Sequence, residues 1–128
     1  MKILVVEDEL LIALEIEMII GDLGHDVVGI ADTCAEALKL AAEHKPDAAT
    51  VDLRLRGGDR GEDLARELRD RLGIRSIFIS GNLDKPTRIL LEPLQPYGCI
   101  GKPLSPASLA EALTAAEGSK SLGGTTSA

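Results

Sequence analysis

Aromatic residues and positive charge are both scarce in this 128-residue chain. There are one Phe, one Tyr and no Trp, so the aromatic platforms on which nucleic-acid bases stack are excluded. Lys and Arg together number 14 against 21 Asp and Glu, which gives a formal net charge of -7. Because attraction to nucleic-acid phosphates needs clustered cations, the composition argues against direct binding of nucleic acid.

Cysteines and long apolar runs are scarce as well. Cys34 and Cys99 show neither a disulfide framework nor the spacing of metal ligands, so we expect two reduced thiols that pack as small apolar groups. The first apolar run, residues 3–6, is too short for a signal-peptide core or a membrane span. The expectation is therefore a cytoplasmic protein with no membrane partner.

Short apolar runs alternate with amphipathic segments along the chain. Runs of strand-forming residues occupy positions 3–6, 27–30, 48–51, 77–79 and 99–100. Helices are predicted over 9–23, from 33, over 61–72, briefly over 87–92 and from 105. Strands that are apolar on both faces and alternate with helices predict an α/β fold, a doubly wound parallel sheet covered on both sides.

The C-terminal end differs in composition from the rest of the chain. Residues 118–128 are mostly Gly, Ser, Thr and Ala, and this segment is predicted to be a flexible tail because it offers little to pack. Residues 1–117 are enough for one domain with one hydrophobic core.

Polar residues follow four of the five predicted strands. Glu7 and Asp8 follow the first strand, Asp52 the third, Ser80 the fourth and Lys102 the fifth. In doubly wound sheets, sites lie beyond the carboxyl ends of the strands. We therefore expect these five side chains to converge on one crevice.

Three carboxylates in one crevice would repel one another without a cation. Because Mg²⁺ is bound by a few carboxylates together with waters and phosphate oxygens, Glu7, Asp8 and Asp52 predict a Mg²⁺ site. A carboxylate held beside the metal can attack phosphorus and form an acyl phosphate, which suggests this role for Asp52. Lys102 would then supply positive charge, and the Ser80 hydroxyl would donate to a phosphoryl oxygen.

Four motifs resemble the receiver domains of bacterial two-component response regulators. They are Val5-Val6-Glu7-Asp8-Glu9, Thr50-Val51-Asp52-Leu53, Phe78-Ile79-Ser80-Gly81 and Gly101-Lys102-Pro103. They come in the family's order and at its spacing, and the resemblance covers residues 1–117. It implies a flavodoxin-like fold of five parallel strands in the order 2-1-3-4-5, with about five helices.

The resemblance also implies a function and the residues that serve it. It implies Mg²⁺-dependent transfer of a phosphoryl group from a sensor histidine kinase or histidine phosphotransfer protein to Asp52. By the family pattern, Glu7, Asp8, Asp52 and the main-chain carbonyl of Arg54 bind the metal. Ser80 and Lys102 contact the phosphoryl group.

The chain departs from the family pattern on its expected output face. The family usually has Tyr or Phe three residues before the motif lysine, and here that position is Cys99, with Tyr97 the nearby aromatic. Pro93 and Pro96 interrupt the preceding helix. We therefore expect a shift or ordering of residues 84–97 to replace the rotation of an aromatic ring.

Three rival functions fit parts of the pattern. A degenerate receiver acting as an unphosphorylated adaptor agrees with Cys99, although the acceptor, hydroxyl and lysine positions are intact. A phosphatase using an aspartyl phosphate commonly has a second acid two residues after its nucleophile, where this chain has Arg54. A flavin or nucleotide binder needs a phosphate-cradling loop after the first strand, where Glu7 and its acidic neighbours would repel phosphate.

The expected role is thus a signalling module rather than an enzyme, since it would catalyse only its own phosphorylation and dephosphorylation. No effector domain follows residue 117, so the resemblance suggests a stand-alone receiver that acts through an unknown downstream protein. The resemblance is also compatible with a weak homodimer.

Overall fold

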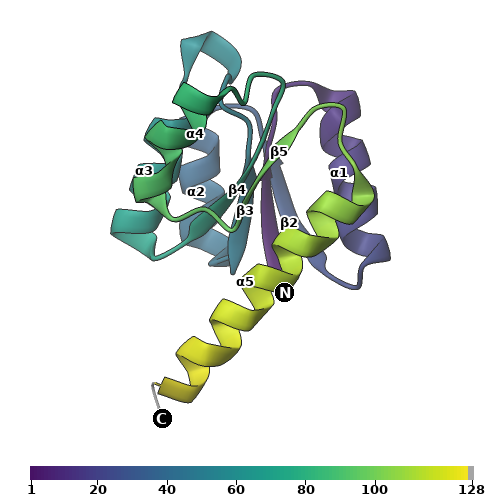
Figure 1. Ribbon diagram of the computed structural model, residues 1–128, viewed down its shortest axis with the longest axis vertical. Helices are drawn as coiled ribbons and strands as arrows, with labels where there is room; N and C mark the ends of the chain where they lie inside the picture. Colours follow the sequence, from purple (N-terminus) through teal and green to yellow (C-terminus); the bar gives the residue numbers. More distant parts are fainter. Residues whose placement is uncertain (127–128) are drawn as a thin grey trace.

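A parallel five-stranded sheet forms the middle layer of the molecule (Figure 1). The computed structural model describes the backbone of residues 1–126 and the side chains of residues 1–120. The strands are β1 (Lys2–Val6), β2 (Asp26–Ala31), β3 (Ala48–Val51), β4 (Arg75–Ser80) and β5 (Gly98–Gly101). They lie in the order β2-β1-β3-β4-β5, with every neighbouring pair parallel. This is the flavodoxin-like arrangement, and it confirms the predicted fold class.

Helices cover both faces of the sheet, which explains why adjacent residues within a strand, such as those of 3–6, are both apolar and buried. One face carries α1 (Leu10–Asp22) and α5 (Pro106–Thr126); the other carries α2 (Cys34–His44), α3 (Gly61–Leu72) and α4 (Lys85–Leu91) (Figure 1). Along β1, Leu4 and Val6 belong to the core cluster on the α2 and α3 side, whereas Ile3 and Val5 belong to the cluster on the α1 and α5 side. Successive side chains therefore point into different cores.

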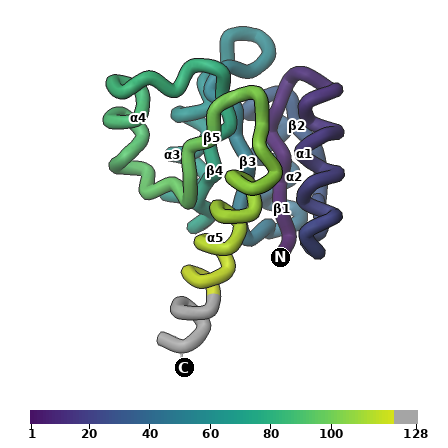
Figure 2. Tube along the Cα trace, turned by 45° about the vertical axis from the view of Figure 1, so that its right-hand side comes forward, coloured from purple at the N-terminus to yellow at the C-terminus, as the bar shows by residue number. Residues whose placement is uncertain are grey.

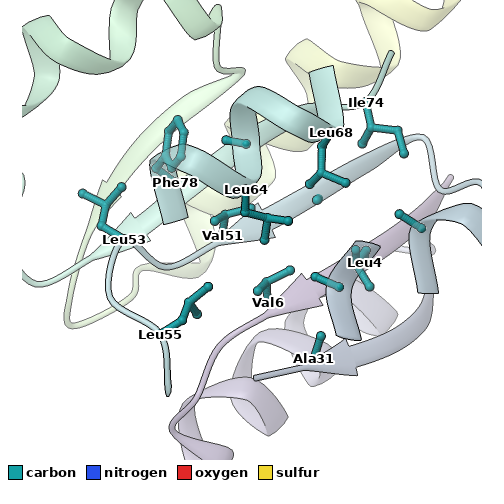
Figure 3. Packing of buried hydrophobic residues seen from close by; sticks show 14 of the residues in the cluster. Leu4, Val6, Ala31, Val51, Leu53, Leu55, Leu64, Leu68, Ile74 and Phe78 are labelled. Atoms are coloured by element: carbon teal, nitrogen blue, oxygen red, sulfur yellow. The ribbon is translucent and has the colours of Figure 1, made fainter. Parts of the chain in front are cut away.

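The core beneath α3 follows from the four-residue spacing of its leucines. Leu64 and Leu68 are fully buried and face the strand that carries Val51 (Figure 3). Phe78, the one Phe of the chain, is buried in the same cluster. Residues four apart lie on one face of a helix, so this face of α3 packs on the sheet while its charged face stays in solvent.

Local signals fix where several elements begin and end. The Thr33 hydroxyl accepts a hydrogen bond of 3.2 Å from the Glu36 N–H at the start of α2. Gly73 has φ 67°, a left-handed conformation that favours glycine, and it ends α3. A 3₁₀ turn (Glu92–Leu94) follows α4, because Pro93 has no N–H to donate to a continuing helix. The fourth helix is therefore short and irregular, as its prolines predicted.

The last helix continues beyond Ala116, the last of its residues in the core cluster on the α1 and α5 side. α5 runs to Thr126, so the backbone of residues 118–126 is helical where the sequence predicted a tail. The helix extends away from the sheet, as Figure 1 shows to Thr126 and Figure 2 shows for the coloured part of α5. The Arg75 guanidinium donates to the Ser119 hydroxyl at 3.3 Å, and Lys120 Nζ lies 3.0 Å from Asp47 Oδ1. The flexibility predicted for the tail and the boundary at residue 117 stay predictions, and residues 127–128 lie outside the described part. Among the described residues, no helix is both long and apolar enough to cross a membrane.

Candidate functional site

The carboxyl ends of the central strands bring the predicted site residues to one edge of the sheet. Register pairs Val6 with Val51 and Ser80 with Gly101, so the residues that follow these strands start side by side. Backbone hydrogen bonds continue past the strand ends. The Asp52 N–H donates to the Val6 carbonyl at 3.0 Å, and the Lys102 N–H donates to the Ser80 carbonyl at 3.0 Å. These bonds fix the backbone from which the polar side chains emerge.

Glu7, Asp8 and Asp52 form a compact cluster, here called the acidic site. Each offers a carboxylate oxygen, and these oxygens lie within 4.8 Å of one another. Glu7 is 2% exposed and Asp52 is 7% exposed, whereas Asp8 is partly open to solvent. Charges this close and this poorly solvated repel strongly, so the arrangement requires compensating positive charge.

Lys102 supplies part of that charge from the end of β5. Its ammonium lies 2.8 Å from Asp52 Oδ2 and 2.8 Å from Glu7 Oε1. Partial burial alone would lower the pKa of Lys102, but the hydrogen bonds and charges of Asp52 and Glu7 outweigh it and raise that pKa. Lys102 is therefore held protonated between two carboxylates.

The burial of Glu7 changes its acidity. Burial raises the pKa of Glu7 to about 7, and the nearby charge of Asp52 adds to the rise. The Lys102 ammonium and the backbone N–H of Glu9, which donates to Glu7 Oε2 at 3.2 Å, act in the opposite direction. One lysine thus compensates the acidic site only in part.

The remaining predicted residues border a cleft next to the acidic site. This cleft of about 330 Å³ is lined by Asp8, Glu9, Asp52, Arg54, Ser80, Gly81, Asn82 and Lys102. The Ser80 hydroxyl accepts a hydrogen bond of 3.4 Å from the Asn82 N–H. The Arg54 N–H donates to Asp52 Oδ1 at 3.3 Å. All six predicted site residues are therefore close together. Five of them border the cleft, and Glu7, which does not, contacts Lys102, one of the residues that do.

Two backbone hydrogen bonds connect the two ends of the loop between β3 and α3. The Leu55 N–H donates to the Asp59 carbonyl at 3.0 Å, and the Gly61 N–H donates to the Leu53 carbonyl at 2.9 Å. Neither bond uses the carbonyl of Arg54, which stays available for a ligand. The Arg56 guanidinium is paired with Asp32, since its Nε lies 3.0 Å from Asp32 Oδ2.

Two features of the site left no signal in the sequence. Asn82 lines the cleft, but it lies in a loop where no spacing rule applies. The pairing of Arg56 with Asp32 joins two loops that are separated in sequence by the whole of α2 and β3, so only the folded structure shows it.

The donor set fits a hard divalent cation. It consists of carboxylate oxygens, the ligands that Mg²⁺ prefers, and the acidic site carries more negative charge than Lys102 offsets. An acidic triad of this kind is typical of the Mg²⁺ site of receiver domains.

The surroundings of Cys99 and Tyr97 also differ from the family pattern. Cys99 packs against the core cluster on the α2 and α3 side, and burial raises the pKa of its thiol. Tyr97 packs against the opposite cluster, and its ring centroid lies 4.2 Å from the Arg75 guanidinium carbon. The two side chains therefore lie on different faces of the sheet, and Tyr97 does not take the place of the missing aromatic.

A parallel sheet in this strand order, with an acidic triad and a lysine at its carboxyl edge, is consistent with a phosphoacceptor site. Residues 3–114 match the response regulator receiver domain, and the chain belongs to that family. The family is one of two-component signalling, its members are typically not true enzymes, and a receiver domain generally implies a cognate histidine kinase.

Particular relatives support the assignment. The phyllosphere-induced regulator PhyR of Methylorubrum extorquens is 37% identical over 117 residues, which are 90% of this chain and 43% of that protein. The transcriptional regulatory protein PdtaR of Mycobacterium tuberculosis is 29% identical and is covered to 55%. This chain thus spans about half the length of the curated relatives it matches.

Solved structures show the same fold. PhyR from Brucella abortus superposes with a TM-score of 0.84 at 32% identity, covering 98% of this chain and 51% of that chain. The receiver domain of a modulated diguanylate cyclase from Desulfovibrio desulfuricans gives a TM-score of 0.85 at 31% identity, covering 94% and 96%.

Proposed function

We propose that this chain is a phosphoacceptor module that receives a phosphoryl group on Asp52. The donor is a sensor histidine kinase or a histidine phosphotransfer protein, and the transfer requires Mg²⁺. The observation that carries the proposal is the Lys102 ammonium, 2.8 Å from Asp52 Oδ2, beside a cleft that also holds Asp8 and Ser80.

The chemistry follows from these positions. A carboxylate oxygen of Asp52 attacks the phosphorus of a phosphohistidine, so that an O–P bond forms while the N–P bond breaks and the imidazole leaves with its electron pair. The Lys102 ammonium and the Ser80 hydroxyl donate hydrogen bonds to the phosphoryl oxygens. Mg²⁺ would be held by Glu7, Asp8, Asp52 and the Arg54 carbonyl, and it supplies positive charge to the transferring group.

The output we propose is a change in residues 84–97 that a downstream protein reads. α4 has only seven residues, and a 3₁₀ turn follows it at once, so this segment lacks the continuous backbone hydrogen bonding of a longer helix. A charge added at Asp52 can bias such a segment between two arrangements. One relative, PhyR from Bartonella quintana, is described as an anti-anti-sigma factor, and by that likeness we propose a regulatory protein as the downstream partner.

Acetyl phosphate, a small phosphodonor, tests the acceptor directly. Incubation with acetyl phosphate and Mg²⁺ should add one phosphoryl group by intact mass, stable in acid and labile in base. The Asp52→Asn variant should take up none. Labelling that persists in this variant would contradict the assignment of Asp52.

A panel of histidine kinases, assayed with Mg²⁺ and with a chelator, then tests the donor. Transfer should require the metal and should be rapid for one kinase of the panel. Multiple turnover of a generic phosphate ester would instead support the phosphatase alternative.

A further inference from the structure

The first residue of α3 lies directly against the backbone of the proposed phosphoacceptor. Gly61 is buried, and a Cβ atom added there would overlap the carbonyl oxygen of Asp52. The same atom would lie 2.8 Å from the Asp52 carbonyl carbon and 2.9 Å from Leu53 Cα, whereas real Cβ atoms essentially never come within 3.0 Å of a heavy atom outside their own and the adjacent residues. Only a glycine fits between α3 and this stretch of backbone.

The need for glycine at this position is one of space. Gly57 and Gly58, in the same loop, have φ of 74° and 81°, which favours glycine through its backbone freedom. A Cβ atom at either position would meet nothing within 4 Å. Gly61 lies outside the left-handed region, so its backbone suits any residue and the close approach to Asp52 alone excludes a side chain.

The overlap falls on backbone that carries two proposed functional groups. Asp52 presents the acceptor carboxylate, and two residues further along, Arg54 presents the carbonyl proposed for the metal. The short loop cannot absorb a displacement, since the Gly61 N–H is bonded to the Leu53 carbonyl and the Leu55 N–H to the Asp59 carbonyl. Asp59 also accepts a hydrogen bond of 2.8 Å from the Cys34 N–H, which ties the loop to α2.

We infer that Gly61 is a positioning residue for phosphoryl transfer. By letting α3 begin in contact with the Asp52 carbonyl, it sets where the acceptor carboxylate and the Arg54 carbonyl stand relative to the acidic site. This inference rests on the proposed phosphoacceptor function. Its consequence is that one added methyl group at position 61 changes metal binding and transfer together, although that group lies outside the cleft.

The test compares Gly61→Ala with Gly57→Ala as a matched control in the same loop. The first substitution displaces the Asp52 backbone, while the second introduces backbone strain without touching any neighbour. Mg²⁺ binding is measured by amide NMR shifts without a phosphodonor. The phosphorylation rate is then measured over a range of acetyl phosphate concentrations at saturating Mg²⁺.

A displacement of about 1 Å at a reacting group can cost roughly 100-fold in rate. We therefore expect Gly61→Ala to lower the maximal phosphorylation rate by about 10- to 100-fold and to weaken Mg²⁺ binding about tenfold. The concentration of acetyl phosphate at half-maximal rate should change little, because the variant misplaces the acceptor and leaves the cleft for the donor open. Gly57→Ala should keep both the rate and the Mg²⁺ affinity near those of the wild type.

Several outcomes would overturn the inference. A folded Gly61→Ala with wild-type Mg²⁺ affinity and maximal rate would do so, as would equal losses in both variants. If Gly61→Ala is unfolded in plain buffer, the measurements are repeated in a stabilising osmolyte. Failure to fold there too would show that Gly61 supports the fold rather than the site. If the wild type does not accept a phosphoryl group at Asp52, the proposed function itself is wrong. The wild-type measurement distinguishes that result from a failure of the inference about Gly61.

Discussion

Replacing Lys102 by Met tests the electrostatics of the acidic site. In the described part of the structure, Lys102 is the only cation within ion-pair distance of Glu7 and Asp52, at 2.8 Å from each. Met keeps the length and apolar stem of the side chain but removes the ammonium. The variant therefore leaves two poorly solvated carboxylates without their partner.

The expected magnitude follows from burial. Removing one partner of a fully buried ion pair costs about 3–5 kcal/mol. Because the Lys102 side chain is 17% exposed, solvent reduces this cost, and we expect about 1–3 kcal/mol in the absence of Mg²⁺. For a domain of this size, where 1 kcal/mol corresponds to about 3–5 °C, the melting temperature should fall by roughly 3–15 °C.

Mg²⁺ should reverse the loss. Two unit charges about 4 Å apart interact by about 1 kcal/mol in water and about 4 kcal/mol near a protein surface, so removing a competing cation should tighten Mg²⁺ binding on the order of tenfold. A ligand that binds only the folded state stabilises it, and the variant should regain stability as Mg²⁺ is added.

Thermal unfolding followed by circular dichroism, with a chelator and then at increasing Mg²⁺, measures both effects. Lys120→Met is the matched control, because Lys120 is exposed in its pair with Asp47 and ion pairs of exposed side chains contribute little. Equal melting temperatures of Lys102→Met and wild type in chelator would refute the reasoning. So would a destabilisation that Mg²⁺ leaves unchanged.

Four further outcomes are expected. Burial, with the charge of Asp59, raises the pKa of Cys34 to about 11, so iodoacetamide should modify it about tenfold faster per pH unit between pH 8 and 10; a rate that levels off near pH 8.5 would contradict this. Thr33→Ala should cost about 1 kcal/mol in denaturant unfolding and Thr33→Ser much less, because the hydroxyl caps α2; equal losses would exclude the cap. Leu68→Ala should cost about 2–5 kcal/mol, since Leu68 is fully buried, and a loss below 1 kcal/mol would disprove its place in the core. Beryllium fluoride with Mg²⁺ should change hydrogen exchange most over residues 84–97, with little dependence on Tyr97; a response confined to α1 or α3 would place the output elsewhere.

The alternation of apolar runs with helical segments predicted most of the fold because the central strands β1, β3 and β4 are buried on both faces. Ile3 and Leu4 point into different cores, so their adjacency in sequence already indicates a sheet covered on both sides. The strand order came from the family resemblance, since alternation alone does not tell which strand lies at the edge. The length of α5 was not predicted, because Ser119 and Lys120 are held by Arg75 and Asp47, far away in sequence.

The sequence predicted which side chains come together at the candidate site, but not how deeply they are buried or which of them are in contact. Strand ends place Glu7, Asp52 and Lys102 at one edge, a consequence of parallel topology. No spacing shows that Glu7 is buried behind Lys102, or that the two share a contact of 2.8 Å. Nor does sequence show that Gly61 is pressed against the backbone of Asp52, because that contact depends on how α3 packs.

The position of Tyr97 gives the molecule an optical property. The chain contains one Tyr and no Trp, so ultraviolet-excited emission comes essentially from this single ring. The ring lies under the Arg75 guanidinium, at the junction between the α4 segment and β5. Fluorescence of the unlabelled protein therefore reports on one known place, on the face of the sheet opposite Cys99, without background from any other residue.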